Sequence, residues 1–407
     1  MVTTFYPPYH FGGDAIYAYN LSNELAKLGH QVDVIHCYDA FRAISGEPDT
    51  EWPNHENVRI HTLRSPWKLL SPVLTHQTGR SGLKKKAIEE IFRKNDFDVI
   101  HYHNISLLGG VDILAAGEAI KLFTLHEYWL ICPTHIMFKN NSRPCEKAEC
   151  LRCQLIYRRP PQLWRSAGKI AAMVKPVDRF LVSNRFTVEL HKQRGLDLNA
   201  EILPLFINLP EKTESLAEQS RDDEQDYFLF AGRLEKLKGL QDVLPFFVDS
   251  AEHSLLVAGT GSYEAKLRRL AGNSPNIHFL GLQSASSLRR LYQNARATII
   301  PSLCYEVSPL VIAESWSCGT PVIARELGSL KEVVEDFGGG LCFSSIEELK
   351  VQLTRLAADN VLRDRLSKAA SKAWSSHWTP GKHMERYLGT IDTIRTEAQP
   401  ATTIGGA

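Results

Sequence analysis

The chain has 407 residues and carries 47 lysine or arginine and 46 aspartate or glutamate residues, which leaves a formal net charge of +1. This balance excludes a nucleic-acid binder of the strongly basic kind, while 43% hydrophobic and 23% charged residues are typical of a globular protein. Eight cysteines are too few for a disulfide scaffold, and neither a membrane-spanning stretch of ~20 apolar residues nor a secretory leader is evident, so we expect a cytoplasmic protein.

Short runs rich in β-branched and aromatic residues alternate with helical patterns along the chain. In the first half, we predict strands at residues 1–5, 31–36, 58–63, 98–102, 122–126 and 179–183. In the second half, the predicted strands are 227–231, 254–258, 277–280, 297–301, 321–324 and 340–343. Helical patterns are clearest at residues 13–28, 83–92, 265–271 and 310–318. This alternation, repeated in two halves, predicts two α/β units, each with a parallel sheet.

A strongly polar linker at residues 210–226 divides the chain into nearly equal halves. In doubly wound sheets, ligands bind beyond the carboxyl ends of the strands. Two such sheets that face each other would therefore form a cleft, and the loops that follow the strands are the place to look for a site.

Two glycine pairs occupy such loops. Gly12 and Gly13 precede a predicted helix, where glycine lets the backbone approach a ligand and the helix N-terminus favours an anion. A plain strand-to-helix turn is the alternative. Gly259 and Gly261 follow a strand, and a lone Gly-x-Gly is often only a turn, although it permits close approach of a nucleotide.

Arg233 and Lys238 project from the loop after the strand at 227–231. Two cations at a strand end, before a helix, suit a diphosphate. A solvated charged loop is the alternative, because Glu235 and Lys236 are interleaved with them. The position at a strand end favours the functional interpretation.

Two glutamates, eight residues apart, follow the strand at 297–301. Glu306 lies in the loop, and Glu314 falls in the second turn of a helix that Pro309 is predicted to begin. We expect the free N–H groups of Leu310 and Val311 to point at the cleft as an anion site. A buried carboxylate at position 314 could accept hydrogen bonds from both hydroxyls of a ribose.

His126 ends the strand predicted at 122–126, and Glu127 follows it. It is a candidate polar contact or proton handler in the cleft. A core histidine bonded to a backbone carbonyl is the alternative, and the position alone does not separate the two.

Four cysteines fall within 22 residues, in a polar stretch without helix or strand period: Cys132, Cys145, Cys150 and Cys153. The thiolates of Cys145, Cys150 and Cys153, with Cys132 or His135 as the fourth ligand, would form a structural, tetrahedral zinc site. Free thiols or a disulfide are the alternatives, and a cytoplasmic setting disfavours the disulfide.

Residues 163–174 place apolar side chains on one helical stripe, with basic residues in and around it. A basic amphipathic helix suits an anionic membrane surface and a lipid-linked acceptor. An ordinary helix that packs on a core is the alternative, and we favour it slightly.

Glu306 and Glu314, with Arg233, Lys238 and the Gly-Thr-Pro-Val-Ile run at residues 319–323, resemble the signature of the retaining glycosyltransferases of family 4. The resemblance runs along almost the whole chain and includes Tyr-Pro-Pro…Gly-Gly and Thr-Leu-His-Glu-Tyr-Trp-Leu-Ile-Cys-Pro in the first half. It implies the α/β fold called GT-B, with two facing Rossmann-like domains and an interdomain cleft. The implied parts are an acceptor-binding domain at 1–207, a donor domain at 208–378, a helix at 379–396 that crosses back to the N-terminal domain, and a disordered tail at 397–407.

The resemblance implies a metal-independent retaining transfer of hexosyl type, from a nucleotide-diphosphate sugar (a UDP- or GDP-sugar) to an acceptor hydroxyl. Arg233 and Lys238 would bind the diphosphate, and Glu314 the ribose. His126 and Glu306 would contact the donor sugar as the catalytic residues, with no protein nucleophile. The implied donor-binding set is Gly12, Gly13, Arg233, Lys238, Gly259, Gly261, Ser308, Leu310, Val311 and Glu314.

The implied role is in polysaccharide, glycolipid or glycoconjugate synthesis, with a sugar, lipid-linked glycan or other hydroxyl acceptor entering from the N-terminal domain near Gly12 and Gly13. No nucleic-acid partner is expected, and the enzyme would be cytoplasmic or peripheral at the inner face of the cell membrane. The alternatives are a sugar-nucleotide epimerase of related fold and a catalytically inactive nucleotide- or glycan-binding protein.

Two departures from the family pattern carry expectations of their own. Val307 and Pro309 stand where the family often has glycine, so we expect a tighter or differently shaped donor-sugar pocket. The chain also begins inside the first predicted strand, so we expect a short edge of the first sheet.

Overall fold

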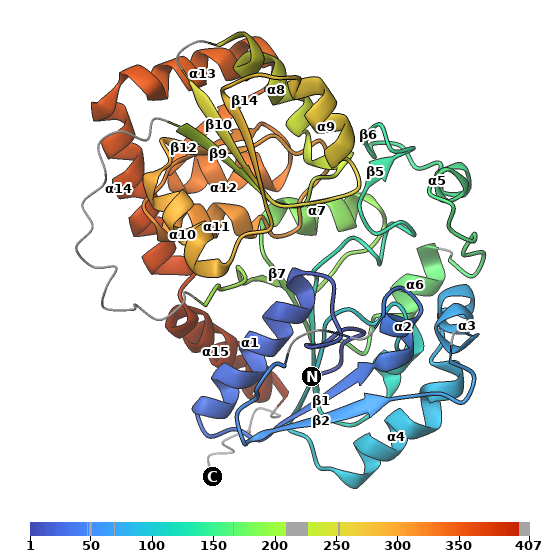
Figure 1. Ribbon diagram of the computed structural model, residues 1–407. Helices are drawn as coiled ribbons and strands as arrows, with labels where there is room; N and C mark the ends of the chain where they lie inside the picture. The colour runs from blue at the N-terminus through green and yellow to red at the C-terminus, as the bar shows by residue number, and fades with distance from the viewer. Residues whose placement is uncertain are drawn as a thin grey trace, which may run out of the picture.

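The computed structural model describes residues 1–398 apart from 47, 49–50, 69, 166, 209–226 and 251–252. Two lobes, each built on parallel strands with helices packed around them, lie one above the other in Figure 1. The linker predicted at 210–226 and residues 399–407 of the predicted tail lie outside the described residues.

The N-terminal lobe holds two groups of parallel strands. One has the order β3 (Val99–Tyr102), β4 (Ile120–Thr124), β7 (Arg179–Val182) and β8 (Ala200–Ile202), and the other pairs β1 (Val32–Cys37) with β2 (Val58–Leu63). Val2 makes parallel bridges to both Ile35 and Tyr102, so the start of the chain lies between β1 and β3. The strand predicted at 1–5 is thus reduced to isolated bridges.

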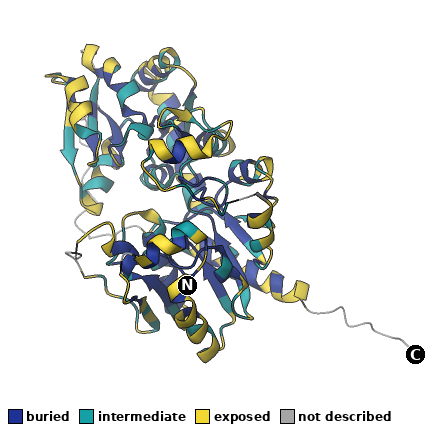
Figure 2. Ribbon diagram, turned by 90° about the vertical axis from the view of Figure 1, so that its right-hand side faces the viewer, coloured by how far each residue is buried: buried dark blue, intermediate teal, exposed yellow. Residues whose placement is uncertain are grey.

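The C-terminal lobe holds one six-stranded parallel sheet. Its order is β11 (Ile277–Gly281), β10 (Ser254–Ala258), β9 (Tyr227–Ala231), β12 (Ala297–Ile300), β13 (Val322–Arg325) and β14 (Gly340–Phe343). The central strand β9 reads Tyr-Phe-Leu-Phe-Ala and is buried along its whole length, because helices cover both faces of such a sheet. In Figure 2, buried residues line the strands of both lobes.

Helices connect the strands and cover the sheets. In the N-terminal lobe they are α1 (Gly13–Lys27), α2 (Tyr38–Arg42), α3 (Leu70–Thr78), η1 (Gly82–Lys84), α4 (Lys85–Lys94), η2 (Val111–Ala115), α5 (Cys150–Ile156), α6 (Ala167–Met173) and α7 (Arg185–Gln193), with a small hairpin of β5 (Phe138–Lys139) and β6 (Arg143–Pro144). After β9 they are η4 (Lys236–Lys238), α8 (Leu240–Asp249), α9 (Glu264–Ala271), α10 (Ala285–Asn294), α11 (Leu310–Ser317), α12 (Ser329–Phe337), α13 (Ile346–Ala358), α14 (Asn360–His377) and α15 (Pro380–Ala398).

The last helix, α15, packs on the N-terminal lobe against α1 and β4 (Figure 1). Met384 and Tyr387 share a buried apolar cluster with Tyr17 and Leu21 of α1. The guanidinium of Arg179 contacts Glu397 at 2.9 Å, so ion pairing joins the end of α15 to β7. The boundaries at 207/208 and 378/379 stay a prediction.

The stripe predicted at residues 163–174 faces the inside of the N-terminal lobe. Ile170 and Val174 are buried in its largest apolar cluster, and Trp164 and Ala171 pack against that cluster. The membrane interpretation of this helix is therefore wrong, because its apolar side is already covered by the core. No helix within the described residues is long and apolar enough to cross a membrane.

Candidate active site

The loops that follow β9 and β12 bring Lys238 and Glu306 into direct contact. The Lys238 Nζ atom lies 2.7 Å from Glu306 Oε1, and the hydroxyl of Ser302 donates to the same oxygen at 2.7 Å. Parallel neighbours end at the same edge of the sheet, so two sequence-predicted donor-site residues meet although 68 positions separate them.

Their contact fixes the charges of both groups. Burial would by itself raise the pKa of the Glu306 carboxyl, but the Lys238 ammonium and the Ser302 hydroxyl outweigh it, and the pKa lies below its ordinary value. Burial would likewise lower the pKa of Lys238, but the Glu306 carboxylate raises it above its ordinary value. Both side chains are therefore charged at neutral pH.

Glu314 lies one helical turn inside α11 and points at a neighbouring helix. Its Oε2 atom accepts a hydrogen bond of 2.8 Å from the hydroxyl of Tyr292 in α10. Burial raises the pKa of the Glu314 carboxyl, and the Tyr292 hydroxyl partly opposes that rise. Tyr292 is fully buried, so the carboxylate is held in one orientation.

Arg233 lies in the same loop region but turns toward Glu235, with 2.8 Å between Nη1 and Oε1. Its side chain is 67% exposed, so it can rotate at little cost. Gly259 and Gly261 pack directly against this loop: a Cβ atom would stand 2.0 Å from the carbonyl oxygen of Gly232 and 2.4 Å from that of Leu234, respectively. These glycines therefore have a close-packing role in the turn.

The N-termini of α11 and α1 meet across the two lobes. A Cβ atom on Gly13 would lie 3.3 Å from Cδ1 of Leu310, and Gly12 precedes α1 in an extended conformation. Helix α11 begins at Leu310 with Pro309 as its N-cap, one residue later than predicted. The N–H of Leu310 already donates to the carbonyl of Ser308 at 2.9 Å, so the prediction that this N–H group is free is wrong.

His126 lies in the loop after β4 and is bonded to a second histidine. Its Nε2 atom lies 3.0 Å from Nδ1 of the buried His103, so one ring donates and the other accepts. Burial lowers the pKa of His126, although the carboxylates of Asp14 and Glu127 oppose this. The alternative interpretation expected a histidine bonded to a backbone carbonyl, but the partner of His126 is the side chain of His103.

The predicted zinc site does not form. Among the residues that the structure describes, no group of three or more His, Cys, Asp or Glu side chains could hold a metal ion, and the cysteines are free thiols. Cys132 is buried and hydrogen-bonded to the Thr134 hydroxyl, Cys153 is buried and accepts from the N–H of Asn140, and Cys150 is exposed at the start of α5. The loop is ordered instead by the β5–β6 hairpin and by the Arg194 guanidinium, which donates to the carbonyl of Cys145.

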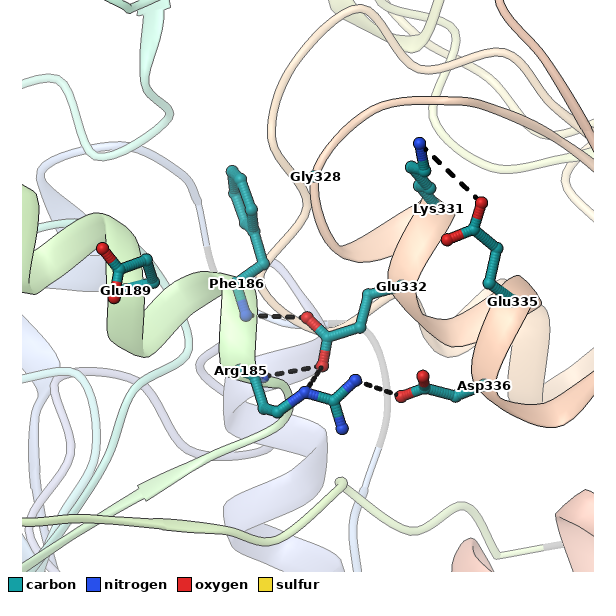
Figure 3. Close-up of a pocket in the computed structure, with 8 residues that line it drawn as sticks. All are labelled: Arg185, Phe186, Glu189, Gly328, Lys331, Glu332, Glu335 and Asp336. Atoms are coloured by element: carbon teal, nitrogen blue, oxygen red, sulfur yellow. Dashed lines mark hydrogen bonds and ion pairs between the residues drawn. The ribbon is translucent and has the colours of Figure 1, made fainter.

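The two lobes are joined around the start of α7. The backbone N–H groups of Arg185 and Phe186 donate to the Glu332 carboxylate of α12 at 2.8 and 2.7 Å, and the Arg185 guanidinium contacts Asp336 at 2.7 Å (Figure 3). Close by, the amide of Asn184 donates to the carbonyl of Val307 at 2.6 Å.

Sequence reasoning did not find several of these groups. Asn184 follows a predicted strand, and asparagine there is a helix N-cap signal that could have drawn attention to it. Tyr292 and Glu332 carry no local pattern, because their partners lie 22 and 147 positions away in the chain. Ser302 bonds to Glu306 only four positions away, but a serine after a strand is too common to indicate this role.

Comparison with known proteins identifies both halves. The family model "Glycosyltransferase Family 4" matches residues 11–210, and "Glycosyl transferases group 1" matches residues 211–373. An uncharacterized glycosyltransferase of Methanocaldococcus jannaschii is 25% identical over 366 residues, which cover 84% of this chain and 83% of that protein.

Solved structures show the same fold. The sucrose-phosphate synthase of Thermosynechococcus elongatus superposes with a TM-score of 0.71 at 17% identity, over 98% of this chain and 99% of that one. HepE of Anabaena, solved in complex with UDP, gives a TM-score of 0.65 at 14% identity, over 96% and 99%. The predicted GT-B arrangement is thereby confirmed.

Proposed function

Because this chain belongs to the family 4 glycosyltransferases, we propose that it moves a sugar from a nucleotide-diphosphate donor to an acceptor hydroxyl with retention of configuration and without a metal ion. The observation that carries this proposal is the half-buried contact of Lys238 with Glu306, at the carboxyl ends of the two central strands of the C-terminal sheet. Family membership does not favour the epimerase alternative, and a catalytically inactive binding protein would have little use for such a charged pair.

In the proposed mechanism the ion pair of Lys238 and Glu306 forms before the donor binds and separates when it binds. The diphosphate would take Lys238 as its counter-ion, with Arg233 rotating in from Glu235, and these cations would stabilise the leaving group. The Glu306 carboxylate would then be free to accept hydrogen bonds from hydroxyl groups of the donor sugar. The departing phosphate would help to remove the acceptor proton on the same face, so we assign no protein nucleophile.

Glu314 would bind the ribose, because Tyr292 fixes its carboxylate beside the helix start. His126, held by His103, would present its second ring nitrogen near the reacting carbon. Gly12 and Gly13 would let the acceptor lobe approach closely, which the contact of Gly13 with Leu310 supports. Gly259, Gly261, Ser308 and Val311 remain proposed neighbours of the nucleotide.

The UDP complex of HepE supports a UDP-sugar as the first donor to try. A hexose is the proposed sugar, and a growing polysaccharide, glycolipid or other glycoconjugate is the proposed acceptor. We propose that transfer takes place at the inner face of the cell membrane.

Helix α3 is the membrane contact that we propose in place of residues 163–174. Its exposed side carries Leu70, Val73 and Leu74, whereas Ser71 and Thr75 face the lobe, which reverses the usual order of a surface helix. Residues 57–88 contain no aspartate or glutamate, and their exposed basic residues are Arg59, Arg64, Lys68, Arg80, Lys85 and Lys86. An apolar patch inside a purely basic segment fits an anionic lipid surface.

Thermal unfolding against a panel of nucleotide sugars tests the function. At ~100 times its dissociation constant, the correct donor should stabilise the protein by about 2.7 kcal/mol. Turnover of that donor with acceptors should persist in EDTA and give a product of unchanged anomeric configuration by NMR. No shift with any donor, or a metal requirement, would contradict the proposal.

A further inference from the structure

Two neighbouring carbonyls of the loop that carries Glu306 are held by side chains of the other lobe. The hydroxyl of Tyr128 donates to the carbonyl of Glu306 at 3.2 Å, and the Nδ2 group of Asn184 donates to the carbonyl of Val307 at 2.6 Å. Both donor side chains are buried. The Glu306 carbonyl also accepts the hydroxyl of Ser329 of its own lobe at 2.6 Å, so the bond from Asn184 to Val307 is the shorter of the two contacts that reach this backbone from the acceptor lobe.

Asn184 uses both ends of its amide. Its Oδ1 atom accepts the N–H of Thr187 at 2.9 Å and so caps α7, while its Nδ2 group reaches across to Val307. The side chain is 2% exposed, and the two bonds fix which way the amide faces. Serine or aspartate could cap the helix equally well, but an ionised aspartate has no donor, and the serine hydroxyl sits on a shorter side chain that ends before the position of the Asn184 Nδ2 group.

The same end of α7 is anchored a second time. Glu332 of α12 accepts the N–H groups of Arg185 and Phe186, the two residues that follow Asn184 (Figure 3). Asn184 thus sits at a rigid point of the junction, between a helix fixed to α12 and the loop that carries Glu306.

We propose that Asn184 is a positioning residue of the transfer reaction: it makes the correct placement of Glu306 depend on contact between the lobes. This inference rests on the proposed function, in which Glu306 orients the donor sugar. When the lobes separate, the Val307 carbonyl loses its partner and the loop at 302–309 relaxes. The sugar is then oriented for reaction only while the acceptor lobe is in place, which protects the donor from water.

The test compares Asn184→Ser and Asn184→Asp with the wild-type chain. Both variants keep an N-cap oxygen. Serine is too short to replace the hydrogen bond to the Val307 carbonyl, and aspartate places a carboxylate oxygen next to that carbonyl oxygen, which is repulsive. We expect kcat to fall by about tenfold or more in Asn184→Ser and further in Asn184→Asp, because small misplacements of reacting groups are costly. The affinity for UDP alone should stay within about twofold, since a change of tenfold would need ~1.4 kcal/mol at the nucleotide itself.

The matched control is Asp359→Ala, which removes an N-cap far from the site. Asp359 caps α14 by accepting the N–H of Leu362 at 2.8 Å. This variant should lower the melting temperature without lowering kcat. Wild-type kcat in Asn184→Ser would overturn the proposal, and so would a parallel loss of UDP affinity and thermal stability, because that pattern indicates a merely structural role.

Hydrogen exchange separates this inference from the proposed function. In Asn184→Ser, the amides at 302–309 should exchange faster while those of α7 stay protected, whether or not a donor has been found. A wild-type chain that turns over no nucleotide sugar would refute the proposed function and leave this exchange result standing. Unchanged exchange at 302–309 would refute the role of Asn184 even in an active enzyme.

Discussion

Glu332 accepts the backbone N–H of Arg185 at 2.8 Å, so a carboxylate of the C-terminal lobe caps a helix of the N-terminal lobe. A hydrogen bond to a charged group contributes about 1.5–3 kcal/mol, and a helix N-terminus favours the negative charge further. The junction between the lobes is therefore polar and specific, and it can be weakened by single substitutions.

Removing this cap should destabilise the protein. We expect Glu332→Ala to lower the free energy of unfolding by about 1.5–3 kcal/mol in urea titrations. Glu335→Ala, on the same helix, is the control: Glu335 is 57% exposed and lies 3.8 Å from Lys331, so its loss should cost less than about 1 kcal/mol. Equal losses in the two variants would contradict the capping role.

Substitution of the predicted donor-binding residues should remove transfer while the fold persists. Lys238→Ala deletes the counter-ion of the diphosphate, and Glu314→Ala deletes the ribose acceptor. Each charge-assisted contact is worth roughly 1.5–3 kcal/mol, so kcat/KM should fall by about 10- to 150-fold or more. Lys350→Ala, at an exposed position of α13, should behave as wild type. Near-normal transfer in either site variant would refute the assignment.

The hydroxyl of Tyr292 should affect donor binding only through its hydrogen bond to Glu314. Tyr292→Phe removes the 2.8 Å bond and should raise the KM for the donor by about 2- to 13-fold, which corresponds to roughly 0.5–1.5 kcal/mol. Tyr227→Phe is the matched control, because its hydroxyl donates to the carbonyl of Leu291 outside the proposed site. If both variants raise the KM alike, the bond to Glu314 has no special role.

Acid should destabilise the protein through its buried histidines. Burial lowers the pKa of His36, His191 and His383 from 6.5 to about 4. Between pH 6.5 and about 4, these histidines are protonated in the unfolded chain but stay neutral in the folded chain. Their contribution to the free energy of unfolding is therefore fully present above pH 6.5 and is lost as the pH falls toward about 4. Each group contributes up to about 1.4 kcal/mol per pH unit.

Urea titrations between pH 7 and pH 5 check this slope. His191→Gln should flatten it by up to about 1.4 kcal/mol per pH unit. A slope that is identical in the variant and the wild-type protein would show that His191 does not contribute to the acid limit.

The α3 surface predicts binding to anionic lipid. Vesicles that contain phosphatidylglycerol should sediment the protein, and replacing Leu70, Val73 and Leu74 by serine should abolish this. Leu282→Ser removes an even more exposed apolar side chain, but from the C-terminal lobe, and should have no effect. Binding that does not depend on anionic lipid would contradict the proposal.

The sequence predicts the sheets well, because parallel strands are buried on both faces and read as continuous apolar runs, as β9 does. Strands β5, β6 and β8 have only two or three residues and leave no pattern to detect. The cysteine spacing looked like a metal site, but spacing does not say which way the thiols point.

The candidate site is predictable only in part. Lys238 and Glu306 each follow a strand, so the rule on strand ends is enough to bring them together. The bond from Asn184 to Val307 joins residues 123 positions apart and depends on how the lobes meet, which no local pattern encodes. The sequence also does not predict that the apolar side of α3 is exposed and its polar side buried, because apolar spacing alone does not say which face of a helix is covered.

Helix α15 has a consequence for biosynthesis. The cluster that includes Tyr17 and Leu21 is completed by Met384 and Tyr387, so a ribosome must have reached these two residues before this core can close. The six-stranded sheet, by contrast, uses only residues 227–343 and can assemble earlier. The half that is translated first is therefore the half that finishes folding last, and until then it exposes an apolar surface on which chaperones would act.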